Sequence, residues 1–596
     1  TGDTGQTPST EPMDVNILER LKVSPTITPE TTDLLGEQID LNSGSISFKH
    51  TDISLPGNSS LDVAVRRVFK GLSRRGKTPG DFADWHLDIP NIHTTLSYWD
   101  GDYSGSWGVG QGCSGPLNPG TANDMHNVFQ DFQYWNGDTL NVPGHVNDKL
   151  LEPTTNLTSE LGGNISGITR VTKSNWRIKC FTRGIPGASS NADSFEGFIA
   201  YAPNGTQYTF DEPRLTADIK DDYKPREHAI KYQAYMMVSK IEDRFGNWVQ
   251  YEYDAISRLT RIHANDGREI TLKYNEAEPF EENISIVIAN GREWRYAYTG
   301  SNANNRVLHT VMRPDTRSWT FDLVDIGVKK PIANNSLCGY DNATAPTFWG
   351  TITHPNGAVG QFGIKETQHG TSNIDPTQAR ENGVQVIPLC SNHLSLQNKI
   401  LSGPGLPTLN WLYSYSQNSA TTSLTGTMPN NISALNHKIT TVNAPDGSRT
   451  KHYYNRDWTS PAQGMLSVTE QFDTNGTTPL STTQTTYVQA EAVGRSLMRK
   501  TNIVPMDHRI NKSKVVTTLH HSDGNTTYTT DNLSFNTLGS VIKTHEYNAG
   551  SAYSGQRKYI KTTFTNHISG DYYVLQLSTS QSQSNTDSNY AQLSST

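Results

Sequence analysis

The feature of this chain that most constrains its fold is a turn signal that recurs before aromatic strands. Asn-Gly, Asp-Gly or a reduced form of them precedes a strand that contains Tyr or Phe, as in "ANDGREITLKY" and "HPNGAVGQF". Asn and Gly adopt positive φ at low cost, which the tight turn of a β-hairpin requires. The stretches that carry this signal are 202–210, 264–274, 289–298, 313–321, 354–362, 444–454 and 521–530. The chain is therefore expected to consist of many β-hairpins.

A single hairpin is only marginally stable in water, so these units are expected to pair edge to edge in a curved antiparallel sheet. Leu61, Val63 and Val65 alternate with other residues, which predicts a further, half-buried strand. With 596 residues, the chain is too long for one ordinary core. The predicted fold class is all-β: an extended, curved antiparallel sheet of stacked β-hairpins, with an N-terminal β region.

The best-preserved unit lies in Lys240–Asn275, "KIEDRFGNWVQYEYDAISRLTRIHANDGREITLKYN". Through this unit the chain resembles the RHS/YD-repeat family, whose repeat reads roughly G-N-x-x-x-Y-x-Y-D-x-x-G-R-L-T. Ser257 stands where the family usually has glycine, so a local departure in that turn is expected. The motif residues that match are Gly246, Asn247, Tyr251, Tyr253, Asp254 and Arg258.

Each motif residue has a structural interpretation. The tyrosines are expected to pack across neighbouring strands, with stacking on sugars as the alternative. Asp254 is expected to accept hydrogen bonds from turn amides. No catalytic residue is predicted in this chain.

The resemblance extends to segments outside the repeats and implies three parts. The segments that look like the N-terminal region of large bacterial RHS proteins are Glu37–Gly57, Tyr134–Gly144, Asn175–Cys180 and Ile400–Tyr415. The three expected parts are a flexible tether with room for one short helix (1–35), an N-terminal β region of RHS type (36–235) and a YD-repeat β-shell segment (236–596).

In that family the repeats wind as a continuous β-sheet spiral into a hollow shell around a variable C-terminal domain, often a toxin. The family's D-P-x-G-L-like motif is missing from this sequence, so the resemblance implies the front part of a longer protein. The first hypothesis is therefore a structural shell segment of a secreted or cell-surface bacterial RHS protein. It would encapsulate or present a toxin or effector domain absent from this chain, and its partner would be that domain or the rest of the same protein.

Two other functions stay open. The stretch "SYWDGDYSGSW" gathers aromatic rings and carboxylates, which suit a carbohydrate-binding or carbohydrate-active protein with a glycan ligand; the alternative is a loop held by its own aromatic side chains. A third hypothesis is adhesion through exposed edge strands. The residues that would contact carbohydrate are Trp99, Asp100, Asp102, Tyr103 and Trp107.

The four cysteines are widely spaced and form no C-x-x-C pattern. An even number suits two disulfides in an oxidising compartment, and four buried free thiols are the alternative. The family resemblance favours Cys113 with Cys180 and, by default, Cys338 with Cys390. This agrees with the extracellular or cell-surface location that the family implies.

The composition of the chain restricts the classes of partner that it is expected to bind. The formal net charge is −8 with no basic block, which argues against nucleic acid and anionic membranes. The mean hydropathy is −0.60, and no apolar run reaches the length of a membrane span. His93 and the pair His520-His521 lack the spacing of a metal site, so neither metal nor cofactor is predicted.

Overall fold

The fold is all-β, which confirms the predicted class. In the computed structural model, one short helix, α4 (Val324–Val328), accompanies the strands of the described part of the chain. The structure describes residues 34–69, 81–99, 102–104, 112–115, 122–123, 128–129, 137–154, 167–184, 194–224, 227–276, 282–300, 306–328, 345–370, 380–381, 384–385, 390–416, 437–457, 460–474, 476–496, 506–549, 557–569 and 572–595. The expected tether lies almost entirely outside these residues.

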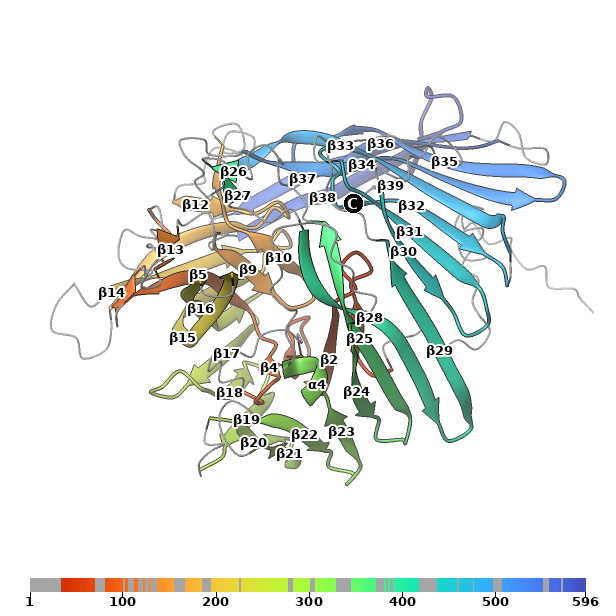
Figure 1. The fold of residues 1–596 in the computed structure, drawn as a ribbon. Helices are drawn as coiled ribbons and strands as arrows, with labels where there is room; N and C mark the ends of the chain where they lie inside the picture. Colours follow the sequence, from red (N-terminus) through yellow and green to blue (C-terminus); the bar gives the residue numbers. More distant parts are fainter. Residues whose placement is uncertain are drawn as a thin grey trace, which may run out of the picture.

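Twenty-one strands pair antiparallel, one after another, around a closed ring. Figure 1 shows this sheet curving from the strands drawn in orange through those in green to those in blue. The ring closes where its first strand pairs with its last. In order, its strands are β11 (Leu151–Pro153), β12 (Ile168–Val171), β13 (Arg177–Gly184), β14 (Ser194–Tyr201), β15 (Gln207–Lys224), β16 (Glu227–Glu242), β17 (Trp248–Tyr253), β18 (Leu259–Ala264), β19 (Glu269–Tyr274), β20 (Ile284–Ala289), β21 (Arg292–Thr299), β22 (Val307–Met312), β23 (Ser318–Asp322), β24 (Thr347–Thr353), β25 (Val359–Gly370), β28 (Cys390–Gly403), β29 (Leu406–Tyr415), β30 (His437–Asn443), β31 (Arg449–Asn455), β32 (Leu466–Phe472) and β33 (Pro479–Ser496).

Two groups of strands extend this ring. Six strands continue the sheet beyond β33 and lie across the top of Figure 1: β34 (Met506–His521), β35 (Gly524–Phe535), β36 (Val541–Ala549), β37 (Arg557–Ser569), β38 (Tyr572–Ser584) and β39 (Ala591–Ser595). A second group pairs with β16 through β5: β5 (Asn91–Trp99), β6 (Asp102–Ser104), β9 (Thr139–Val142) and β10 (Val146–Lys149). Two separate short pairs are β7 (Ala122–Asn123) with β8 (Val128–Phe129) and β26 (Arg380–Glu381) with β27 (Val384–Gln385).

A second, four-stranded sheet lies within the curve of the wall. Figure 1 shows its strands β2 and β4 surrounded by the ring strands. It packs on the wall through aromatic rings: the centroids of Phe48 and Phe362 are 4.8 Å apart, and those of Trp85 and Phe321 are 5.0 Å apart. This inner sheet consists of β1 (Glu37–Ile39), β2 (Ile46–Leu55), β3 (Val63–Phe69) and β4 (His86–Leu87).

The main hydrophobic core is shared between the inner sheet and the wall, because buried residues from both belong to one cluster. This changes one expectation. Strand β3 was predicted to be half-buried, yet six of its seven residues are buried, and the exception is Arg66. A strand of an inner layer is covered on both faces, so alternation in its sequence does not mark a solvent-facing side.

The expected boundary between the N-terminal region and the repeats, near residue 235, stays a prediction. Strand β16 runs through this position, pairing with β5 through one part of its edge and with β17 through another.

Candidate functional site

The repeat unit is built around a five-residue turn. In the turn 254–258, the amide of Asp254 donates to the carbonyl of Arg258 (2.9 Å), and the amide of Ser257 donates back to the carbonyl of Asp254 (3.0 Å). The Asp254 carboxylate accepts from the amides of Ile256 (3.1 Å) and Arg258 (2.9 Å). Burial opposes ionisation of Asp254, but the hydrogen bonds from Arg258 outweigh it and lower the pKa of the carboxyl. The aspartate therefore fixes the turn.

This turn is repeated around the molecule. The same pair of backbone hydrogen bonds closes nine turns among the described residues: 172–176, 202–206, 243–247, 254–258, 264–268, 313–317, 354–358, 444–448 and 536–540. The fourth residue of each has positive φ, and it is glycine in six of them. Gly246 is one of these, and the Asp243 carboxylate accepts from the amide of Asn247 (3.0 Å) in the same turn.

Ser257 keeps the same turn geometry as glycine does. Its φ is 60°, and its hydroxyl donates to the carbonyl of Pro213 (3.0 Å). The local departure that its side chain predicted is therefore absent from the backbone. Residues other than glycine adopt this conformation at a cost, and the hydrogen bond to Pro213 offsets part of it at Ser257.

A series of tyrosines links neighbouring strands of the wall. The hydroxyl of Tyr253 on β17 donates to the carbonyl of Val238 on β16 (2.7 Å), and that of Tyr274 on β19 donates to the carbonyl of Leu259 on β18 (3.0 Å). Burial raises the pKa of both tyrosines well above its ordinary value, so the hydroxyls stay protonated as donors. The side chain of Tyr251, also on β17, is 8% exposed and packs in the core. Three more tyrosine hydroxyls donate to a carbonyl of the neighbouring strand in the same way: Tyr298 to Ile284, Tyr415 to Leu396 and Tyr487 to Leu466.

Buried charges hold the inner sheet to the wall. The guanidinium of Arg67, whose side chain is fully buried, donates from Nε to Asp52 Oδ2 (2.8 Å) and lies over the rings of Trp85 (4.5 Å) and Phe321 (4.6 Å). The hydroxyl of Tyr296 on β21 donates to the same Asp52 oxygen (3.0 Å). An anion on β2 and a cation on β3 are thus fixed by groups of the wall.

A second buried ion pair joins the inner sheet to the wall directly. Lys399 of β28 pairs with Glu37 of β1, and its ammonium lies 4.7 Å from the ring centroid of Trp411. The two side chains are 2% and 3% exposed. Buried charged groups of the inner sheet therefore contact the wall at β21 and β23 and again at β28.

His50 lies at the same interface, with Nε2 donating to the carbonyl of Leu35 (2.9 Å). Its ring packs edge-on against Trp85 and Trp319. Burial is the largest cause that lowers the pKa of His50 well below 6.5, and the positive charge of Arg67 adds to it. The imidazole is neutral where the inner sheet meets the wall.

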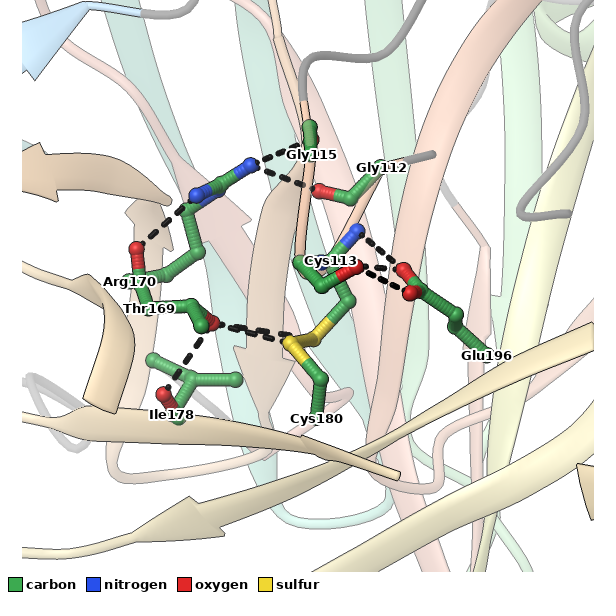
Figure 2. The surroundings of a disulfide bond; sticks show 9 residues. Gly112, Cys113, Gly115, Thr169, Arg170, Ile178, Cys180 and Glu196 are labelled. Atoms are coloured by element: carbon green, nitrogen blue, oxygen red, sulfur yellow. Dashed lines mark hydrogen bonds between the residues drawn. A yellow bond between two sulfur atoms is a disulfide. The ribbon is translucent and has the colours of Figure 1, made fainter. Parts of the chain in front are cut away.

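The Cys113–Cys180 disulfide that the resemblance favoured is present and anchors segment 112–115 to β13 (Figure 2). The Glu196 carboxylate, on β14, accepts from the amides of Cys113 (3.1 Å) and Ser114 (2.9 Å). The Arg170 guanidinium, on β12, donates to the carbonyls of Gly112 (3.1 Å) and Gly115 (2.7 Å). Backbone N–H and C=O groups of this segment are therefore hydrogen-bonded to buried charged side chains. The spacing of these residues in the sequence does not reveal the contacts. The pairing of Cys338 with Cys390 stays a prediction, because the side chains of both lie outside the described residues.

Three of the predicted carbohydrate contacts, Trp99, Asp102 and Tyr103, lie on one hairpin. The backbones of Trp99 and Asp102 pair across β5 and β6, and Tyr103 pairs with Tyr98. Asp100 and Trp107 lie outside the described residues, as do the side chains of Trp99, Asp102 and Tyr103. Sugar binding at this hairpin therefore stays a prediction.

Metal-ligand side chains come together once in the described part of the chain, at Cys113, Cys180 and Glu196. Both sulfurs belong to the disulfide, and the carboxylate already accepts backbone hydrogen bonds, so this group does not suit a metal ion. Among the described helices, none has the length and apolar character needed to cross a membrane.

No protein-family model matches the chain, and no curated protein matches it. Solved structures resemble it at low scores, and three of them have the following similarity. They are the crystal structure of TcdB2-TccC3-Cdc42 (8% identity, 91% of this chain and 46% of that one, TM-score 0.47), the crystal structure of TcdB2-TccC3 without its hypervariable C-terminal region (8%, 92% and 46%, 0.44), and a mutant Photorhabdus luminescens Tc holotoxin pore (9%, 91% and 45%, 0.31).

The chain spans about half the length of these structures. Their TM-scores are below 0.5, so the likeness is distant and says nothing about ligand, partner or activity.

Proposed function

We propose that this chain is a wall segment of a larger RHS-type shell, with the mechanical task of surrounding or presenting another polypeptide region. The observation that carries the proposal is the closed ring of hairpins, in which the motif residues form turns and cross-strand bonds. The carboxylate of Asp254 and the hydroxyls of Tyr253 and Tyr274 are engaged in the wall itself. In this reading, the repeat residues serve structure and any chemistry belongs to the enclosed region.

The two buried ion pairs support the same proposal. The Asp52–Arg67 pair of the inner sheet is bonded to Tyr296 of β21, and Glu37 of the inner sheet pairs with Lys399 of β28, so buried charged groups join the sheet to the wall and favour a fixed curvature. A container requires a wall that keeps its shape without its content. The partner that fits is a further region of the same protein, including the toxin or effector domain that the family resemblance implies.

The test is limited proteolysis of the complete protein purified from its native source. We expect any region beyond residues 1–596 to resist protease until denaturant opens the wall, after which it is cut rapidly. The matched comparison is the destabilised variant Asp52→Asn, in which the same region should become sensitive at a lower denaturant concentration. A region that is cut at equal rates in folded and unfolded protein, or a complete protein with no such region, contradicts the proposal.

A further inference from the structure

The ring closes at one joint between strands that are distant in sequence. Strand β11 pairs with β33 through Leu151 opposite Ser496, Glu152 opposite Arg495 and Pro153 opposite Gly494. The other joints of the ring connect strands that follow one another along the described wall. A joint between distant strands has a larger loop-closure entropy to overcome than a hairpin has. We call the β11–β33 joint the seam.

The backbone ladder at the seam is short. Strand β11 has three residues, and its register with β12 consists of Leu151 opposite Val171. Pro153 has no N–H to donate. By contrast, the β15–β16 joint pairs from Gln207 to Lys224, nearly the whole of both strands. Few hydrogen bonds therefore oppose separation at the seam.

The apolar contacts at the seam are also few and separate from the main core. Leu151, Val171, Val493 and Leu538 form a small cluster of their own, with Ile168 packed against it. The approach of the two backbones depends on Gly494, because a Cβ at this position would lie 2.5 Å from the Glu152 carbonyl oxygen and 2.8 Å from the Leu151 Cβ. The seam thus combines tight backbone contact with little apolar burial.

Polar contacts beside the ladder act as a latch between turn 172–176 and two other segments, β34 and turn 536–540. The Lys173 ammonium pairs with the Asp507 carboxylate (2.8 Å), and Arg509 Nε donates to the carbonyl of Lys173 (3.0 Å). The Asn175 side-chain amide donates to the carbonyl of Leu538 (3.1 Å), across 363 positions of sequence. Since the Lys173 side chain is 45% exposed, salt screens its ion pair.

We propose that the seam is the place where the wall opens. The ladder and the latch separate together while the hairpins on both sides stay paired, and the closed ring becomes an open sheet. This widens the wall enough for an extended polypeptide to enter or leave. The inference depends on how the ring is closed and is independent of what the shell contains.

Hydrogen exchange followed by mass spectrometry on the full chain tests this proposal. The reference is the hairpin joint β30–β31. We expect seam amides on both β11 and the end of β33 to exchange about tenfold faster than those of the reference joint, and at the same rate as each other. Gly494→Ala should accelerate exchange on both seam strands by about tenfold or more, and high salt, which screens the partly exposed Lys173–Asp507 pair, by up to about fivefold. Both should leave exchange at the reference joint unchanged. The matched glycine control is Gly350→Ala on β24, where a Cβ would crowd Ile326 of helix α4 and Leu323 instead of the seam.

A cystine across the seam provides the converse experiment and needs no destabilised variant. The pair Glu152→Cys and Arg495→Cys should slow exchange on both seam strands to the rate of the reference joint. The matched pair Thr441→Cys and Lys451→Cys, which are opposite each other on β30 and β31, should leave seam exchange unchanged. The proposal would be overturned if the seam and the reference joint exchange at equal rates, or if acceleration is confined to β11. It would also be overturned if the seam cystine leaves exchange at the seam unchanged.

Discussion

At the scale of single residues, the fourth position of each turn shows how local chemistry builds the wall. Seven of the nine turns have glycine or asparagine there, residues that tolerate positive φ. The other two have Ser257 and Thr316, with φ of 60° and 68°. The side chain of Ser257 has a partner on another strand, whereas Thr316 is exposed and its hydroxyl reaches the adjacent carbonyl of Asp315.

Thr316→Gly should therefore stabilise the protein by about 1 kcal/mol, because the relief of a β-branched residue at positive φ exceeds the entropy that glycine adds to the unfolded chain. Ser257→Gly is the matched variant, and it should gain less because it loses the hydrogen bond to Pro213. Urea unfolding of the three proteins measures the difference. A destabilised Thr316→Gly would show that this turn carries no strain.

His50 gives a residue-scale prediction for pH. Its pKa is lowered on folding, so below about pH 6.5 the unfolded chain binds a proton that the folded protein excludes. Stability should thus fall with decreasing pH by up to about 1.4 kcal/mol per pH unit from this group, down to the folded-state pKa.

His50→Gln keeps a donor for the Leu35 carbonyl and removes the titration, so its unfolding free energy should depend less steeply on pH between about 4 and 6.5. The measurement is the urea midpoint across this range. The same slope in both proteins would mean that His50 is protonated in the folded state.

At the scale of elements, hairpins could be predicted from sequence because Asn, Asp and Gly determine a turn locally. The turns at 264–268, 354–358 and 444–448 lie where the pattern placed them. One hairpin differs by a position: His521 pairs with Gly524, so Ser522 and Asp523 form the turn and the glycine begins the next strand.

The inner sheet could not be predicted in this way. Its contacts join residues far apart in sequence, such as Asp52 with Tyr296, and its strand β3 lacks the polar face that a surface strand would show. The disulfide could be anticipated from the family resemblance, but the Glu196 and Arg170 contacts around it carry no signal in spacing.

Asp52→Asn tests the buried connection between the inner sheet and the wall. The substitution preserves shape but leaves the buried Arg67 charge uncompensated, which should cost about 3–5 kcal/mol. Glu293→Gln is the control, since its pair with Arg295 is exposed and should contribute less than about 1 kcal/mol. Chemical denaturation monitored by tryptophan fluorescence measures the unfolding free energy of both variants and of the unsubstituted protein. Equal effects would mean that the Arg67 site is accessible to water.

At the scale of the whole molecule, the decisive feature is closure. Each hairpin is specified locally, but the pairing of β11 with β33 depends on the accumulated twist and curvature of all the strands between them. No pattern within either strand encodes the partner, so the sequence predicted a curved sheet and left open whether it closes.

The formation of a cystine in the variant Glu152→Cys with Arg495→Cys tests closure most directly. If the ring is closed, the two positions are opposite each other, and non-reducing peptide mapping should show nearly complete cross-linking under mild oxidation. The hairpin pair Thr441→Cys with Lys451→Cys should cross-link to the same extent. Free thiols at positions 152 and 495, in protein whose hairpin control is fully cross-linked, would contradict the closed wall.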